Sequence, residues 1–290
     1  MRGLTARRSL TFAIAITAFV AVVEFAGGYA SGSLALTTDA VHVCMDVFAL
    51  LLALIAAVGA DLPADRRRTF GYGRIEVLGA LVNGTLLLVA TVVIAYAAAR
   101  RFGSPVEPRA AIMSGVAAIG LCCNGIVGWL LHSSDRNLNV RAALFHVFGD
   151  ALGAVAVVVG GILIALTHQA WIDPALALLV AAIIVTGVVR VMRDATNVLL
   201  ESVPGDVDAA KLTGHLQEIG GVTGVHDLHV WSIGSGSHAL SAHVSLDDRR
   251  LSEATAVLRE IDDCLKSHFG ITHITIQFEC ESCPVVVDHR

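Results

Sequence analysis

Two pairs of residues in the sequence carry side chains that could bind a divalent metal ion. The first pair is His42 and Asp46 and the second is His146 and Asp150, so each pair reads His-x-x-x-Asp. Residues four apart share a helix face, and each pair would therefore present one imidazole beside one carboxylate. Two such helices facing each other supply two nitrogens and two oxygens. This is a complete tetrahedral ligand set, for which zinc is the natural candidate.

Both pairs lie in long apolar segments, where an ionisable side chain without a partner is costly and is a functional candidate by default. The alternative is that these polar groups join helices by hydrogen bonds. The segments contain no Lys or Arg to neutralise the aspartates, so two copies of the motif favour a metal site. Asp39 could orient His42 or lie in solvent near a helix start. Glu24 is expected in a water-lined cavity or beside a partner that the sequence does not identify.

The elements that would position these residues are membrane-spanning helices. Of the 290 residues, 55% are apolar and only 16% are charged, and the mean hydropathy is +0.72. This composition excludes a disordered chain, a secreted mini-protein and a basic nucleic-acid-binding protein. Six apolar runs have the length of about 20 helical residues that a bilayer requires. They lie near 10–30, 35–59, 77–99, 110–132, 142–166 and 172–190.

Arginines predict how these helices are oriented. With the N-terminus inside, eleven arginines flank the helices on the inside and three on the outside, in keeping with the positive-inside rule. Both termini of a multi-pass membrane protein are therefore predicted to lie in the cytoplasm. The first run is read as an uncleaved helix rather than a signal peptide, because five further apolar runs follow it.

The last part of the chain has a different character. Residues 203–290 hold 6 Lys or Arg against 13 Asp or Glu, together with eight of the twelve histidines. Periodicity predicts helices at 206–219 and 251–268 and strands at 225–233, 239–246 and 271–278. The sequence thus predicts an α-helical membrane domain of six transmembrane helices at 1–202. A small α+β cytoplasmic domain, with the order αββαβ, is predicted at 203–290.

At several separated places the chain resembles the cation diffusion facilitator family, and in particular its bacterial zinc-exporting branch. These places are the paired His-x-x-x-Asp motifs, RTFGYGRIEVLGALVNG at 68–84, NLNVR at 137–141, DLHVWSIGSG at 227–236 and LSAH at 240–243. The resemblance runs from about residue 10 to residue 280. It implies a homodimer of six-helix protomers in a bacterial inner membrane, each with a metallochaperone-like cytoplasmic domain.

The resemblance also implies an activity, namely export of Zn²⁺ from the cytoplasm in exchange for protons, with Cd²⁺ or other divalent cations as further substrates. Membrane lipids and a second copy of the chain are the implied partners, and no organic cofactor or nucleic acid is expected. The transport ligands carry over onto His42, Asp46, His146 and Asp150. Regulatory zinc is implied in the cytoplasmic domain, through the positions His229, His243, His273 and Glu279.

Two loops depart from the family's pattern. After the second apolar run, where some members place histidines beside an aspartate, this chain has Asp65 with Arg68 and Tyr72, which argues against a metal site there. The segment 133–139 is short and lacks the histidines that other members carry between the fourth and fifth helices.

Two further pairs of residues each leave an alternative open. Arg74 and Glu201 resemble a salt bridge at the membrane edge, although a solvated arginine would account for Arg74 equally well. Cys280 and Cys283 form a single C-x-x-C, which could add thiolate ligands or be idle.

Other classes of function are also compatible with a metal-binding membrane protein. A passive cation channel or a metal sensor would need no proton coupling. A membrane metalloenzyme would keep an open coordination position and a general base beside its zinc. The sequence offers no third acid or base motif next to the four transport ligands, and this favours transport over catalysis.

Overall fold

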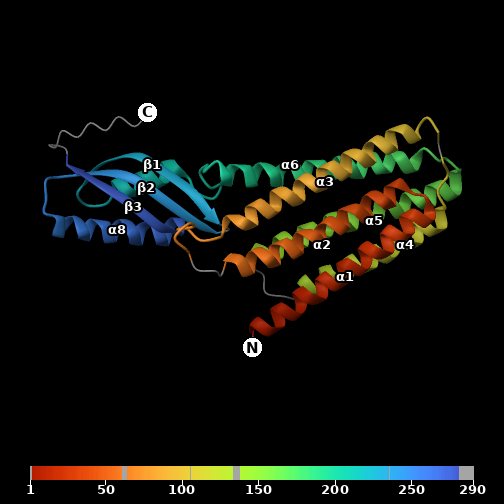
Figure 1. The fold of residues 1–290 in the computed structure, drawn as a ribbon, viewed down its shortest axis with the longest axis horizontal. Coiled ribbons are helices and arrows are strands. Elements are labelled where there is room, and N and C mark those ends of the chain that lie inside the picture. The colour runs from red at the N-terminus through yellow and green to blue at the C-terminus, as the bar shows by residue number, and fades with distance from the viewer. Residues whose placement is uncertain (1, 61–63, 105, 133–137, 235, 281–290) are drawn as a thin grey trace. The chain divides into compact units, whose positions relative to one another are not determined.

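The computed structural model describes residues 2–60, 64–104, 106–132, 138–234 and 236–280. Within these ranges the backbone alone is described at 2–14, 53–54, 56–60, 130–132 and 138–146. The helices are α1 (Arg2–Ser31), α2 (Leu34–Ala60), α3 (Arg74–Arg101), α4 (Ala110–His132), α5 (Leu138–Thr167), α6 (Ile172–Leu199), α7 (Ala209–Gln217) and α8 (Leu251–Phe269) (Figure 1). The strands are β1 (Val222–Gly234), β2 (Ser237–Leu246) and β3 (Ile271–Cys280).

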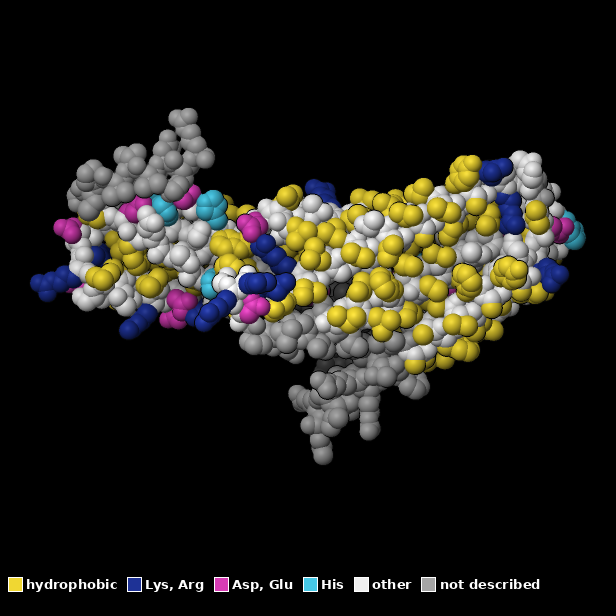
Figure 2. All heavy atoms as spheres, viewed as in Figure 1, with side chains coloured by type: hydrophobic (Ala, Val, Ile, Leu, Met, Phe, Trp, Pro, Cys, Tyr) yellow, Lys and Arg dark blue, Asp and Glu magenta, His cyan; other side chains and the backbone are white. Residues whose placement is uncertain are grey.

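Five stretches of the described helices are long and apolar enough to cross a membrane, and α1 adds a shorter apolar stretch at Ala15–Ser31. The five stretches are Leu34–Leu52, Arg74–Arg101, Ala110–Trp129, Val147–Thr167 and Ile172–Leu199. On the face shown in Figure 2, hydrophobic side chains cover much of this helical region, and charged side chains lie toward its ends. Large apolar side chains exposed on helices are typical of a surface that faces lipid. The predicted fold class is confirmed: a helical transmembrane domain and a small α+β domain.

Contacts along the chain divide it into two compact units. The first comprises residues 1–54 and 80–192, and the second comprises 55–79 and 193–290. The second unit therefore includes the end of α2, the start of α3 and the end of α6 as well as the α+β domain. The predicted boundary between 1–202 and 203–290 stays a prediction.

Small residues let the helices of the first unit approach closely. One core lies where α4 and α5 meet the start of α2, and its fully buried residues include Leu36, Met113 and Ile164. A second core joins α3 to α6 through Leu87 and Val188. Close packing between such helices replaces the hydrophobic effect, which lipid does not supply.

The first turn of α2 is held by a carboxylate from another helix. Asp173 on α6 is fully buried and accepts hydrogen bonds from the Ser33 hydroxyl (2.6 Å) and from the backbone N–H groups of Leu34 (2.8 Å) and Ala35 (3.2 Å). Arg101 of α3 donates to the same carboxylate at 3.1 Å. A helix leaves its first N–H groups without partners inside the helix, and a carboxylate there is doubly favourable because of the helix dipole. Asp173 thus fixes the start of the helix that carries His42 and Asp46.

The α+β domain is confirmed in the predicted order αββαβ. In α8, four residues spaced three or four apart (Ala254, Val257, Ile261 and Leu265) are buried against the sheet and α7. The helix ends at Gly270, whose φ of +64° suits a residue without a side chain. Leu251, which the same periodicity places among the apolar positions, is instead 83% exposed at the first turn.

The three strands form one sheet in the order β1-β2-β3. β1 and β2 pair in antiparallel fashion, and β2 and β3 pair in parallel, with α8 as the crossover between them. The β1–β2 register shifts between His226 and His229, where Asp227 has a φ of +48°. An extra residue in one strand is a β-bulge, and it changes which side chains share a face.

The predicted pairing of Arg74 and Glu201 is confirmed within the second unit. Nη2 of Arg74 donates to Oε1 of Glu201 at 2.9 Å, which excludes the alternative of a merely solvated arginine. Glu201 has a φ of +57°, an uncommon backbone conformation for a residue with a side chain. The pair joins the start of α3 to the chain that follows α6.

The Asp173 hydrogen bonds lead to a stability prediction. Asn has one acceptor oxygen where Asp has two, so Asp173→Asn leaves buried donors unsatisfied and should cost about 1–3 kcal/mol. We expect a lower midpoint of thermal unfolding for the detergent-solubilised protein. The matched control is Asp194→Asn on the same helix, where the side chain is exposed. Equal midpoints for the two variants would contradict this role of Asp173.

Candidate metal centres

The first centre is formed by α2 and α5, which bring one imidazole and two carboxylates together. Nε2 of His42 lies 3.7 Å from Oδ2 of Asp46 and 3.5 Å from Oδ1 of Asp150. One potential ligand atom from each residue lies within 4.8 Å of those of the other two. The three side chains are 15–21% exposed, so the cluster is mostly removed from solvent. A single cation could therefore contact all three.

The fourth predicted ligand, His146, lies on α5 one helical turn before Asp150, but its side chain is outside the described residues. Along the stretches of α1, α2, α4 and α5 whose side chains are described (15–31, 34–52 with 55, 110–129 and 147–167), the sequence has no Lys or Arg. Two carboxylates in such a setting need a positive partner, since an uncompensated buried charge is costly. A divalent cation supplies that charge.

Asp39 extends the same face of α2 by one turn. It is only 4% exposed, which excludes the alternative that it lies in solvent. A Cβ added at Gly153 of α5 would lie 3.6 Å from Oδ1 of Asp39, an ordinary van der Waals distance, and one added at Gly149 would meet open space. Neither glycine is therefore required for the packing of α5 at these positions.

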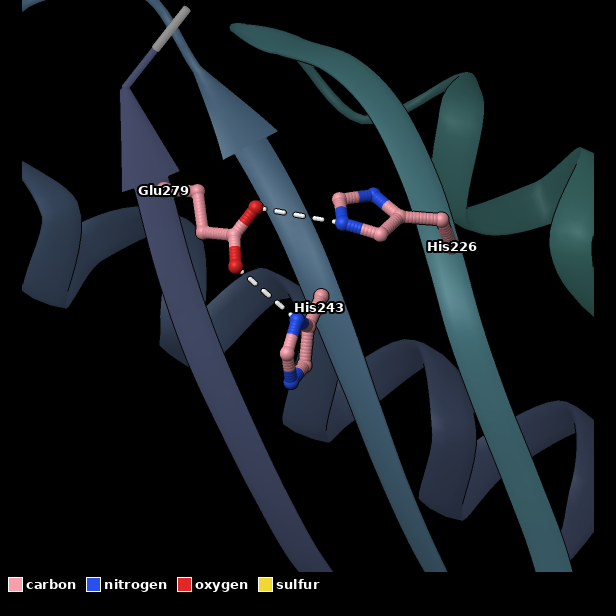
Figure 3. A group of neighbouring side chains, drawn as sticks. All are labelled: His226, His243 and Glu279. Carbon is pink, nitrogen blue, oxygen red and sulfur yellow. Dashed lines mark ion pairs between the residues drawn. The ribbon is translucent and has the colours of Figure 1, made fainter. Parts of the chain in front are cut away.

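The second centre lies in the α+β domain and takes one residue from each strand (Figure 3). Oε2 of Glu279 lies 3.1 Å from Nε2 of His226, and Oε1 lies 2.9 Å from Nδ1 of His243. The two imidazole rings are 5.3 Å apart between centroids. His243 and Glu279 are mostly buried, whereas His226 is 52% exposed. Two imidazoles and a carboxylate form a ligand set suited to zinc.

Sequence reasoning chose His229 for this centre, and the structure brings His226 there instead. The cause is the bulge in β1, which pairs His226 directly with His243 and moves His229 opposite Ser241. Directly paired residues project from the same face of a sheet. Nε2 of His229 contacts Oδ1 of Asp227 at 3.0 Å, while Oδ2 of Asp227 lies 3.6 Å from Nε2 of His243. His229 therefore reaches the centre only through Asp227.

His273 is also absent from the described cluster. It lies six residues before Glu279 on β3, a separation of about 20 Å along a strand. Its ring makes an edge contact with Phe70 at 5.1 Å between centroids. It also lines a cavity of about 430 Å³ with Tyr72 and Glu76. This spacing along one predicted strand could have shown from the sequence alone that His273 and Glu279 do not bind the same metal ion.

In the loop before α3, where the sequence argues against a metal site, Asp65 has the guanidinium of Arg68 as its positively charged neighbour, with 3.9 Å between Nη1 and Oδ2. The Tyr72 hydroxyl donates to Oδ2 of Asp65 at 2.8 Å, and the backbone N–H groups of Arg67 and Arg68 donate to Oδ1 at 2.7 Å each. The guanidinium of Arg68 lies 4.8 Å over the Tyr72 ring. The Tyr72 hydrogen bond, together with these N–H groups, holds the pKa of the Asp65 carboxyl below its ordinary value. The carboxylate thus stays ionised, and its partners are protein groups.

The cysteine pair adds nothing to either centre within the described residues. Cys280 lies at the end of β3 and directly follows Glu279. Successive residues of a strand point to opposite faces, so Cys280 is directed away from the centre. Cys283 lies outside the described residues.

Comparisons with known proteins identify two family domains in this chain. The family model described as the cation efflux transmembrane domain matches residues 10–200, and the one described as the cation efflux protein cytoplasmic domain matches residues 204–281. A solved structure, the metal-bound C-terminal domain of the CzcD transporter of Cupriavidus metallidurans, is 41% identical. It covers 25% of this chain and 99% of that chain, with a TM-score of 0.24.

Three curated relatives match nearly the whole chain. A cadmium, cobalt and zinc/H(+)-K(+) antiporter of Bacillus velezensis is 39% identical over 92% of this chain and 86% of its own. The metal cation efflux system protein CzcD of Cupriavidus metallidurans is 40% identical, covering 95% and 87%. The zinc transporter ZitB of Escherichia coli is 38% identical, covering 95% and 88%. With both domains matched and relatives of this length, the chain belongs to the cation diffusion facilitator family of metal cation efflux proteins.

Proposed function

We propose that this chain exports zinc from the cytoplasm in exchange for protons. Membership of the family supports efflux of divalent metal cations, and the names of relatives include zinc transporters and a proton antiporter. The observation that carries the proposal is the convergence of His42, Asp46 and Asp150 between α2 and α5. These ligand types suit zinc better than an all-oxygen set would. The zinc ion here is the cargo.

Competition for the same atoms links the two ions. Imidazole binds zinc only when it is neutral and carboxylates bind only when they are ionised, so bound protons exclude the metal. Histidine changes its charge within the physiological range, which makes the exchange responsive to a modest difference in pH. When the centre opens to the more acidic side of the membrane, protonation releases zinc. The protons then return as the helices rearrange.

His146 completes the proposed ligand set. It lies one turn before Asp150 on α5, and residues four apart share a helix face. With it the centre has two nitrogens and two carboxylate oxygens. A filled four-ligand shell argues against a metalloenzyme, which would need an open position for water.

The centre of His226, His243 and Glu279 is proposed to bind regulatory zinc. Three protein ligands leave a fourth position for water or for a group of another subunit. The matched cytoplasmic family, ZT_dimer, is named for a dimer, which supports a homodimer. Zinc bound there would report the cytoplasmic metal concentration without lying on the path through the helices. In keeping with the predicted orientation, both termini and this domain are placed in the cytoplasm.

The first prediction concerns the transport carboxylates. Asp46→Ala or Asp150→Ala removes one of the two negative charges that balance a dication in a low-dielectric setting. We expect zinc uptake into inside-out vesicles driven by a proton gradient to fall to background in each variant. Asp194→Ala, which changes an exposed carboxylate of α6, should retain wild-type uptake at equal protein levels. Near-normal uptake by either single variant would refute the assignment. In the wild type, flux without proton dependence would indicate a channel, and no flux would indicate a sensor.

The second prediction concerns metal choice. His42→Asp keeps the helix face but replaces nitrogen by a charged oxygen, so the centre becomes harder and more negative. We expect transport to persist, with the preference for zinc over cadmium or manganese reduced by roughly ten-fold or more, the scale of typical effects around metal ligands. The measurement is zinc uptake with increasing cadmium, wild type beside variant. An unchanged ratio would mean that His42 does not contact the metal.

The third prediction separates His226 from His229. In a full-length Asp46→Ala background, which silences the transport centre, we expect His226→Ala to weaken calorimetric zinc binding by about 10–100-fold. His229→Ala is the matched control and should change it far less, because His229 contacts only Asp227. The reverse order of effects would show that the bulge in β1 does not set the ligand. Equal and negligible effects would place the regulatory zinc elsewhere.

A further inference from the structure

A buried carboxylate beside the transport centre has no part in the ligand set. Glu24 of α1 is 1% exposed, and its Oε2 has no hydrogen-bond partner among the described residues. Its Oε1 lies against Gly120 of α4, in space that the Cβ of any other residue would fill. The absence of a side chain at position 120 thus makes the room in which this carboxylate sits.

The groups that face Glu24 are neutral or acidic. From α2 come Asp39 and the Cys44 thiol, and from α4 comes the Cys123 thiol, packed on the same small core as α1. Asp150 of α5 is the other charged group whose field reaches Glu24. Where the side chains of these four helices are described, there is no Lys or Arg, and His42 is the one histidine. An ionised carboxylate in this place would be unsatisfied as well as repelled by its neighbours.

Three other described carboxylates behave differently. Asp173 is equally buried but accepts four hydrogen bonds, including one from Arg101, so it is satisfied as an anion. Asp46 and Asp150 share His42 and would share a dication. Oε2 of Glu24 has no hydrogen-bond donor among the described residues, and Glu24 is not part of the described ligand cluster. The small cation that fits an unpartnered carboxyl oxygen in a closed space is a proton.

We propose that Glu24 is a proton-binding site coupled to the transport centre through the electric field. It holds a proton while the centre lacks a metal, and it loses that proton to water when a dication binds at His42, Asp46 and Asp150. The O–H bond of the carboxyl group breaks, the electron pair stays on the oxygen, and the anion is then balanced by the nearby dication. By linkage, the proton on Glu24 weakens metal binding by the same factor as the metal weakens proton binding.

This inference rests on the proposed exchange of zinc for protons and deepens it. Protons bound to the ligand residues occupy the same atoms as zinc, so they must leave those atoms before zinc can bind. A proton on Glu24 instead adds to the exchange without occupying a coordination position. The number of protons exchanged for each zinc then exceeds what the ligand set alone would release.

The test is a proton count in the purified, full-length protein. Zinc titrations by calorimetry in potassium-free buffers of different ionisation enthalpy give the protons released for each zinc bound. We expect Glu24→Gln to bind zinc but to release fewer protons, by up to about one. The pH dependence of its zinc Kd should correspondingly be shallower by up to about ten-fold for each pH unit. Glu24→Asp, which keeps a carboxylate, should restore most of the wild-type count.

Two further variants test whether the change in proton count comes from Glu24 itself rather than from the loss of any buried carboxylate. Gly120→Ala changes no ionisable residue, but its added methyl group displaces the carboxylate of Glu24 from its present position. It should lower the proton count, as Glu24→Gln does. Asp173→Asn removes a buried carboxylate that is already satisfied, and it should leave the count unchanged.

The outcomes separate the inference from the proposed function. Equal proton counts and pH slopes in wild type and Glu24→Gln would overturn the inference, and if Glu24→Gln does not fold, a wild-type count in Gly120→Ala would do the same. Zinc uptake by wild-type vesicles that ignores the proton gradient would instead overturn the antiport, whatever the calorimetry shows. Reduced counts in both variants, with proton-dependent uptake in the wild type, would support both.

Discussion

The balance of charge inside an apolar helix bundle is the constraint on which the rest of the structure depends. α2 and α5 place two carboxylates around one imidazole, and neither helix has a Lys or Arg where its side chains are described. Such a group of side chains is stable only with a cation, whether a metal ion or protons. Each kind of cation excludes the other from the same oxygens and nitrogens. Under the proposed function, exchange of a metal ion for protons follows from this composition, provided that the helices open the site to each side of the membrane in turn.

Buried carboxylates in this protein differ in what surrounds them, and that difference separates structural from functional groups. Asp173 is enclosed by donors from the start of α2 and by Arg101, so removing its charge would only cost stability. Glu24 is just as buried, yet one of its oxygens has no described partner. A native fold keeps few unsatisfied buried polar atoms, and each one requires an explanation. The first carboxylate fixes where α2 begins, and the second is available to respond to what α2 binds.

Local patterns predicted much of this arrangement, and long-range register decided the remainder. Apolar runs and periodicity predicted the helices and the order αββαβ, and the spacing of His42 and Asp46 put both on one face. The structure differs from the choice of His229 because the bulge at Asp227 moves the β1 register by one residue, which no periodicity reveals. The role of Asp173 was not predicted either, since its donors lie about 140 residues away in the sequence. Interactions within one element were thus predictable from local patterns. Of the pairings between distant elements, that of Arg74 with Glu201 was expected from the family resemblance, whereas the strand register and the donors of Asp173 were not.

The two candidate centres use the same residue types in opposite proportions, and the proportions match their surroundings. The described part of the transport centre has two carboxylates for one imidazole, so a bound dication is neutralised where the dielectric constant is low. The cytoplasmic centre has two imidazoles for one carboxylate, which would leave a bound dication with a net positive charge. Water can stabilise that charge because His226 is half exposed. A net positive charge of this kind would be costly within the membrane, whereas it is tolerated at a partly exposed site. The proportions of imidazole and carboxylate therefore favour cargo binding at the first centre and sensing at the second.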